Sequence, residues 1–166
     1  MRKLFVILMF CSYIASSQNI AYVDSKYILE NIPEFNTAQD ELNELSLAWE
    51  EEIDLLKDDV ERLYKKYQAE QYLLPEETKR EREKIIIEKE REIKNLTKTR
   101  FGPNGDLYKK QTQLINPIQD LIYNAIANFA DDAAYDIIFD KSSDLIMLFS
   151  DPALDKSDKI LEKLGY

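Results

Sequence analysis

The sequence contains no histidine, and Cys11 is its only cysteine. It also lacks a Gly-x-Ser-x-Gly segment, the pattern that exposes a serine nucleophile on a sharp turn. These absences remove most routes to nucleophilic or acid–base catalysis, because histidine and cysteine are common catalytic side chains. We therefore expect neither enzymatic activity nor a cofactor.

Carboxylates are the remaining candidates for catalysis or metal binding. Glu50–Glu52 and Asp58–Asp59 lie on a predicted exposed helix, where a solvated charged face is the ordinary arrangement. Asp136 and Asp140 flank a predicted strand and are expected to face solvent or a backbone donor. The sequence therefore predicts no catalytic residue and no metal site.

Glycine and proline are scarce too: the chain has three glycines and five prolines, and residues 34–74 contain neither. Apolar residues recur here at intervals of three and four, which predicts one amphipathic helix of about 60 Å. These positions are Phe35, Ala38, Leu42, Leu45, Trp49, Ile53, Leu56, Val60, Leu63 and Tyr67. Two consecutive steps of four around Trp49 predict a locally unwound seam.

A second helical leg is predicted to return along the first. Pro75, followed by Glu76 and Glu77, is typical of a helix start, and this leg runs to about Arg100. Residues 34–74 hold twelve acidic and four basic residues, a net charge of −8, whereas residues 76–100 hold seven acidic and nine basic residues, a net charge of +2. The two legs are therefore expected to attract each other as an antiparallel pair.

A joint is predicted at residues 101–105 (Phe-Gly-Pro-Asn-Gly), which hold two of the three glycines. The alternative, a phosphate-binding loop, is disfavoured because no Lys-Ser or Lys-Thr pair follows at the required spacing.

Residues 1–17 are predicted to be a secretory signal peptide. Arg2 and Lys3 precede an apolar stretch that is too short to span a membrane, and small residues follow at 15–17. The alternative is a buried N-terminal helix. Because Phe10 precedes Cys11, a lipid anchor is not expected. Removal of the signal leaves 20 basic and 32 acidic residues, a net charge of −12. Because this charge repels nucleic acid, we do not expect nucleic acid to be a partner. We also expect no integral membrane segment after the signal is removed.

The remaining segments predict a small body that contains strands. A strand is expected at 19–23, then a short helix capped by Asp24 or Ser25. A helix is expected from Leu107 to about Ala133, in which Pro117 either kinks the helix or begins a new one capped by Asn116.

Two apolar runs follow, at 135–140 and 145–149, and the short connection between them predicts a β-hairpin. The second run is fully apolar, which indicates oligomerisation. A last helix is expected to begin near Asp155 and Asp158 and to end at Leu164 before Gly165.

The predicted fold class is α+β, with a small β-containing oligomerisation body and a long antiparallel helical hairpin. The expected division is a signal peptide at 1–17, a body formed by 18–33 with 107–166, and a hairpin at 34–106 whose tip lies near 72–76.

The order of these segments resembles the Skp or OmpH-like periplasmic chaperones. The segments that carry the resemblance are Asp24–Leu29, Ile32–Phe35, Phe101–Gly105, Asn116–Asp120, Tyr135–Ser142, Asp151–Pro152 and Lys163–Gly165. The resemblance implies a periplasmic homotrimer that holds unfolded outer-membrane proteins, without ATP, in a cavity between helical hairpins. The best-known members are basic, whereas this chain is acidic, so attraction to acidic clients or lipopolysaccharide is not carried over.

In this interpretation, the client is the unfolded protein that the hairpins hold. The residues predicted to contact the client lie at the tip, where little protein covers them: Tyr64, Tyr67, Tyr72, Leu73 and Leu74. Trp49, Leu56 and Ile86 are assigned to the seam between the legs. The residues predicted to form the oligomer are Ile20, Tyr22, Ile138, Leu145, Met147 and Phe149. The alternative function is a structural coiled-coil envelope protein that tethers two fixed partners.

Overall fold

The computed structural model describes residues 18–143 and 146–166. The predicted signal peptide therefore lies outside the described residues. Two compact units are present: the body, formed by the described residues up to Ile32 together with Gln119–Tyr166, and the hairpin unit, Pro33–Ile118. The boundary at 118/119 falls inside one helix, whereas the sequence pattern predicts a division at 106/107.

The hairpin unit is built on α3, which spans Pro33–Glu70 and is roughly 57 Å long at 1.5 Å per residue. A short 3-10 turn, η2 (Gln71–Leu73), follows it, so the first leg ends four residues before the predicted Leu74. Helix α4 spans Glu76–Phe101, as the sequence predicts. Pro75 precedes its first turn as the N-cap residue rather than forming part of it.

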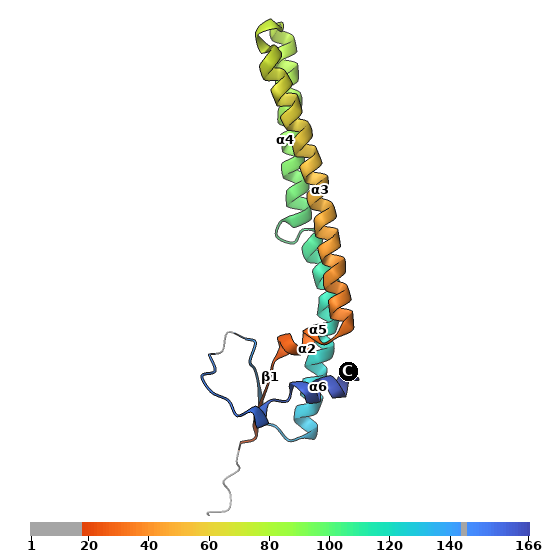
Figure 1. Ribbon diagram of the computed structural model, residues 1–166, viewed down its shortest axis with the longest axis vertical. Helices are drawn as coiled ribbons and strands as arrows, with labels where there is room; N and C mark the ends of the chain where they lie inside the picture. The colour runs from red at the N-terminus through yellow and green to blue at the C-terminus, as the bar shows by residue number, and fades with distance from the viewer. Residues whose placement is uncertain (1–17, 144–145) are drawn as a thin grey trace, which may run out of the picture. The chain divides into compact units, whose positions relative to one another are not determined.

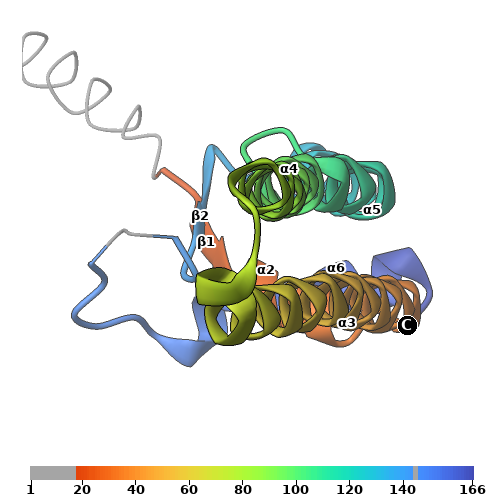
Figure 2. The same cartoon turned by 90° about the horizontal axis from the view of Figure 1, so that it is seen from above.

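Helix α5 (Asp106–Asp132) begins after the predicted break at Gly102–Gly105. Figures 1 and 2 show α4 and the first part of α5 following each other beside α3. Ala38 and Leu42 of α3 pack with Ile115 of α5, and nearer the tip Ile53 of α3 and Ile86 of α4 are buried. The apolar seam predicted from the sequence therefore holds the legs together.

Pro117 lies inside α5, which continues unbroken around it. The alternative in which a new helix begins at Asn116 is therefore wrong. Proline removes one hydrogen bond of the helix and its ring crowds the preceding turn, while the packing of Leu114, Ile115 and Ile118 in the core of the hairpin unit favours a continuous helix.

The body is organised around a two-stranded parallel sheet of β1 (Ile20–Val23) and β2 (Ile137–Asp140). Ile20 pairs with Ile137 and Val23 with Asp140, and Tyr22 forms a further parallel bridge to Asp155 on the other side of β1. The α+β fold class is confirmed.

The predicted β-hairpin between residues 135–140 and 145–149 is wrong. The first run supplies β2, but its partner is β1, which lies more than a hundred residues earlier. Residues 146–149, the described part of the second run, form no strand. The physical reason is the route of the chain: β2 pairs with one side of β1 and Asp155 bridges to the other side, so the segment between them crosses over instead of returning along the open edge of β2.

Short helices complete the body. Helix α2 (Ser25–Glu30) is capped by Asp24, whose carboxylate accepts a 3.0 Å hydrogen bond from the Tyr27 amide, as predicted. The 3-10 turn η3 (Pro152–Leu154) leads to α6 (Ser157–Leu164), which ends at Gly165 with a φ of 94°, a conformation that favours glycine. Val23, Ile28 and Ile160 are the most deeply buried large side chains.

Candidate functional site: the hairpin tip and the exposed apolar segment of the body

The tip of the hairpin exposes two large apolar side chains. Tyr72 and Leu73 lie on η2 and are 88% and 86% exposed. Tyr64 lies two turns earlier on α3 and is about half exposed. Because η2 connects the ends of two helices, neither leg has a neighbouring turn that could cover Tyr72 and Leu73. These residues therefore form an exposed apolar surface within the described chain.

Other tip residues hold the turn in place. The Tyr67 hydroxyl donates to the Glu83 carboxylate of the opposite leg, and this hydrogen bond raises the pKa of Tyr67. Arg82 donates to Glu70 at 2.5 Å, which lowers the pKa of Glu70. Tyr67 and Leu74 are half-buried. Of the five residues predicted to bind the client, Tyr72 and Leu73 are therefore the most accessible.

The joint between α4 and α5 is held by an aromatic and ionic cluster on α3. The rings of Trp49 and Phe101 meet edge to face at a centroid distance of 6.2 Å. The Arg100 guanidinium lies 4.6 Å from the Trp49 ring centroid and pairs with Asp106 at 3.0 Å and with Glu52 at 3.6 Å. The stacked cation and the paired carboxylates tie the three helices together. The predicted interruption at Trp49 thus faces the predicted joint.

The residues predicted to form the oligomer differ in accessibility. Ile20 and Ile138 are half-buried on β1 and β2, and Tyr22 is buried within its own chain. Leu145 lies outside the described residues. Met147 is half-buried, whereas Phe149 is 86% exposed.

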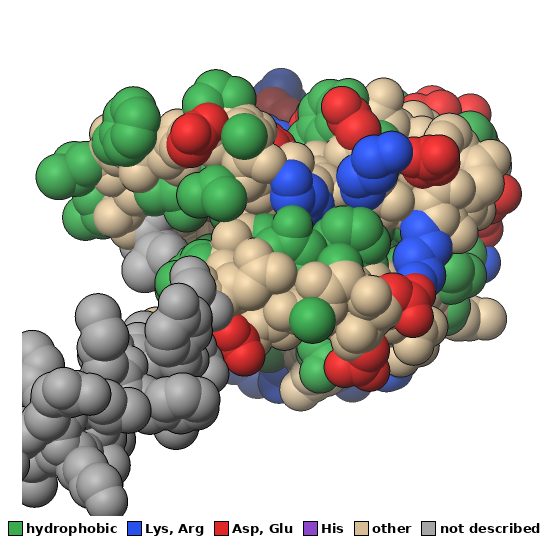
Figure 3. Space-filling model, turned by 90° about the horizontal axis from the view of Figure 1, so that it is seen from below, with side chains coloured by type: hydrophobic (Ala, Val, Ile, Leu, Met, Phe, Trp, Pro, Cys, Tyr) green, Lys and Arg blue, Asp and Glu red, His purple; other side chains and the backbone are tan. Residues whose placement is uncertain are grey.

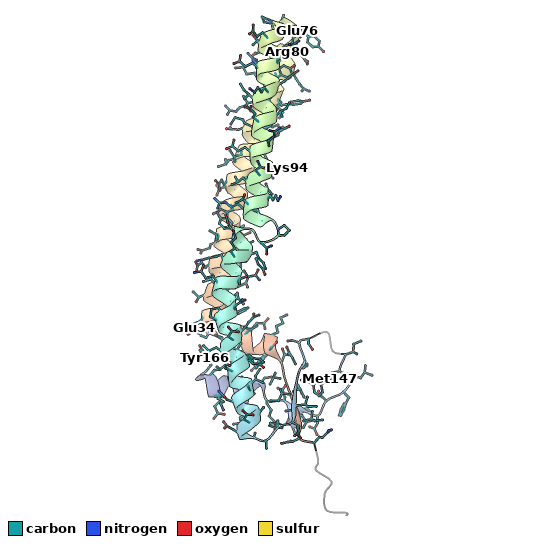
Figure 4. The ribbon with its side chains drawn as sticks, turned by 180° about the vertical axis from the view of Figure 1, so that it is seen from behind. Glu34, Glu76, Arg80, Lys94, Met147 and Tyr166 are labelled. Atoms are coloured by element: carbon teal, nitrogen blue, oxygen red, sulfur yellow. The ribbon has the colours of Figure 1, made fainter. Side chains whose placement is uncertain are left out.

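Sequence reasoning misses the two residues beside Met147. Ile146 is 85% exposed and Leu148 is 95% exposed. The predicted strand would place residues 145, 147 and 149 on one face and residues 146 and 148 on the opposite face, so the prediction does not assign Ile146 and Leu148 to the oligomer contact. The described residues of this run form no strand. The unbroken apolar run is the available signal. Figure 3 shows hydrophobic side chains gathered at the side of the body where this segment lies, and Figure 4 marks Met147 within it.

Asp140 and Asp136 are both engaged with donors, as predicted. Asp140 accepts hydrogen bonds from the amides of Ser25 and Ser142 at 3.1 and 3.0 Å and from both hydroxyls at 2.6 and 2.8 Å. Burial alone would raise the pKa of Asp140, but these hydrogen bonds outweigh it and lower the pKa. Asp136 accepts from the Asn19 amide at 2.8 Å. Both carboxylates therefore fasten the ends of the sheet.

Within residues 18–143 and 146–166, no helix combines the length and hydrophobicity that crossing a membrane requires. The same part of the chain contains no group of three or more acidic or cysteine side chains placed to hold a metal ion.

Comparison with known proteins identifies a family and a similar solved structure. A family model described as outer membrane protein (OmpH-like) matches residues 19–164. A crystal structure of a candidate outer membrane chaperone (OmpH-like) from Caulobacter crescentus CB15 superposes with a TM-score of 0.70. It shares 9% sequence identity, and the alignment covers 90% of this chain and 85% of that one. No curated protein sequence matches the chain.

Proposed function

Because the chain belongs to the OmpH-like family of outer membrane proteins, we propose that it is a periplasmic holdase: a chaperone that binds unfolded outer-membrane proteins and prevents their aggregation. The similar Caulobacter structure, described as an OmpH-like outer membrane chaperone, supports this choice of function. Export through a cleaved N-terminal signal would bring the protein to its clients.

The exposure of Tyr72 and Leu73 at the hairpin tip carries the proposal. Adjacent exposed apolar side chains that form a contiguous patch mark contact surfaces, whereas singly exposed ones do not. Tyrosine and leucine offer apolar area to an unfolded segment without requiring one sequence, and the tyrosine hydroxyl can meet its backbone groups. Many such contacts, each weak, hold a client and release it again.

Charge on the hairpin gives the complex its solubility. Charged side chains stand out along the legs, from Glu76 and Arg80 near the tip to Lys94 farther along α4 (Figure 4). They keep the hairpins hydrated and discourage their collapse around a client. Burial of apolar area drives this binding by itself, so the proposed mechanism needs no ATP, other cofactor or catalytic residue.

The assembly that we propose is a homotrimer in which three hairpins surround a cavity. The exposed side chains of Ile146, Leu148 and Phe149 support self-association, since a monomer would leave all three in water. Ile137 and Phe139 on β2 are partly exposed too. No strand of the described chain pairs with the second edge of β2, so this edge is available to another copy.

Client holding can be measured by diluting a urea-unfolded outer-membrane barrel protein into buffer that contains the purified protein. We expect light scattering to show a trimer and a defined soluble complex. Changing Tyr72, Leu73 and Leu74 to Ser should weaken client binding by on the order of tenfold, because about 1–2 kcal/mol of apolar contact is lost. The trimer should remain intact.

The matched control places three serines at exposed apolar positions away from the tip, Leu55, Ile85 and Tyr108. This variant should hold the client more tightly than the tip variant does. Undiminished holding by the tip variant would disprove the tip assignment. A monomer or dimer with a precipitating client would instead favour the tethering function.

A further inference from the structure

The outward faces of the two hairpin legs carry opposite charges in the same heptad spacing. Seven exposed positions on α3, separated by alternating steps of four and three, form the acidic stripe: Asp40, Glu44, Leu47, Glu51, Asp54, Asp58 and Glu61. Six exposed positions on α4 with the same spacing form the basic stripe: Arg80, Lys84, Ile87, Arg91, Lys94 and Lys98. This spacing keeps each set on one face of its helix.

The stripes point away from the seam that joins the legs. Ile53 and Ile86 are buried between α3 and α4, and Glu51, two residues before Ile53, lies about half a turn of helix from this seam position. Within the described chain, the cations at positions 80, 91, 94 and 98 form no ion pair, whereas Lys84 pairs with Glu88 of its own helix. The cations of the basic stripe are thus largely unneutralised by their own hairpin.

Two ion pairs across the legs show which residues lie at the same level. Glu52 pairs with Arg100 near the joint, and Glu70 pairs with Arg82 near the tip. Counting from these pairs places Asp54 level with Lys98, Asp58 level with Lys94, and Glu61 level with Arg91. In two copies placed next to each other with hairpins pointing the same way, three acids of one copy would face three cations of the other.

We propose that neighbouring hairpins dock on each other, the basic stripe of one on the acidic stripe of the next, and close the space between them when no client is held. This rests on the proposed assembly. Each copy would use both stripes once, so the contact can be repeated around a rotational axis. A second copy is the favoured partner because one chain supplies both stripes at one level.

The net charge of the hairpin opposes such an approach. With −8 on residues 34–74 and +2 on residues 76–100, two hairpins repel each other on average. Only a specific alignment of the stripes attracts. This opposition makes the proposal testable, because average charge and stripe alignment predict opposite results when acids are replaced.

The reporter is a disulfide between Asp58→Cys and Lys94→Cys in the full chain with Cys11→Ser. Within one hairpin these positions lie on the outer sides of two packed helices, with Cα atoms about 13–15 Å apart for axes about 8–10 Å apart and a Cα radius of about 2.3 Å. This is too far for a disulfide, which needs Cα atoms within about 7 Å. Mild oxidation should therefore link separate copies. The control, Glu51→Cys with Lys94→Cys, is one heptad out of alignment and should link at least fivefold less.

Charge reversal around the reporter completes the test. Changing Asp54 and Glu61 to Lys lowers the net negative charge but sets cations against cations, so linking should fall at least fivefold. Adding Arg91→Glu and Lys98→Glu should restore it. If Asp54→Lys with Glu61→Lys raises the yield of disulfide-linked copies, the proposal is overturned, because the net charge of the hairpins would then control how closely they approach each other.

Light scattering on the same samples separates this inference from the proposed function. A trimer whose reporter links no better than the control overturns the docking and leaves the holdase assembly standing. A monomer overturns both. If the reversals leave linking unchanged while Arg91→Glu and Lys98→Glu weaken client capture, the basic stripe serves the client and the docking is again overturned.

Discussion

At the scale of single residues, Asp140 shows how a carboxylate serves the fold rather than chemistry. It stands at the end of β2 and accepts hydrogen bonds from Ser25, the first residue of α2, and from Ser142. The same carboxylate therefore ends a strand and fixes the start of a helix that is distant in sequence. The pKa of Asp140 is lowered because these hydrogen-bond donors stabilise its ionised carboxylate.

The stability of the body should depend on pH through Asp140. Its folded-state pKa is below the ordinary value of 3.8, so its stabilisation is complete above that value and is lost as the pH falls through the lower, folded-state pKa. Asp140→Asn should lower the free energy of unfolding at pH 7 by about 1–2 kcal/mol. Urea unfolding followed by circular dichroism would measure this difference.

The same experiment at pH 3 should show a smaller difference between Asp140→Asn and the original protein. Asp136→Asn is a suitable comparison, because within the described residues the Asp136 carboxylate accepts one hydrogen bond, from the Asn19 amide. A difference for Asp140→Asn that stays constant between pH 7 and pH 3 would contradict this assignment.

At the scale of elements, local pattern predicts the long helices well. Intervals of three and four identify α3 without reference to the rest of the chain, and Gly102 and Gly105 mark where α4 gives way to α5. An added Cβ at Gly102 would lie 2.3 Å from the Lys98 carbonyl oxygen, which explains why a small residue is needed at this break.

Pairing between distant segments could not be predicted in this way. The run at 145–149 has the composition of a strand, but the chain after β2 crosses to the other side of β1, where Asp155 bridges to Tyr22. Likewise, the position of the tip was predictable, whereas the Tyr67–Glu83 hydrogen bond depends on the register of the two legs. Composition indicates what a segment can form, and non-local geometry decides the outcome.

Pro117 offers a test of the cost of an interrupted helix. Pro117→Ala would restore an amide that can donate to the Gln113 carbonyl in α5, so the free energy of unfolding should rise by about 1–3 kcal/mol. Pro33→Ala is the control, since Pro33 is the first residue of α3, where a missing amide hydrogen costs little. Equal effects of both substitutions in urea unfolding would refute the explanation.

At the scale of the whole molecule, the exposed segment of the body is expected to decide the state of assembly. Changing Leu148 and Phe149 to Ser should convert a trimer into smaller species, because each copy loses two large apolar contacts. The mass from light scattering at several protein concentrations would measure this. Leu55→Ser with Ile85→Ser removes comparable apolar side chains from the hairpin and should leave the mass unchanged.

The parallel pairing of β1 with β2 also sets an order in which the chain can fold. β1 is synthesised early, yet its partner strand follows only after the whole of α3, α4 and α5. Closing so long a loop without intermediate structure is slow and entropically costly. Helix formation and contact between neighbouring legs are local and fast, and the packing of Ala38 and Leu42 against Ile115 draws the two ends of that loop together. Contacts between the hairpin legs are therefore expected to form before the sheet does, and β1 is expected to wait for its partner until α3, α4 and α5 have been synthesised.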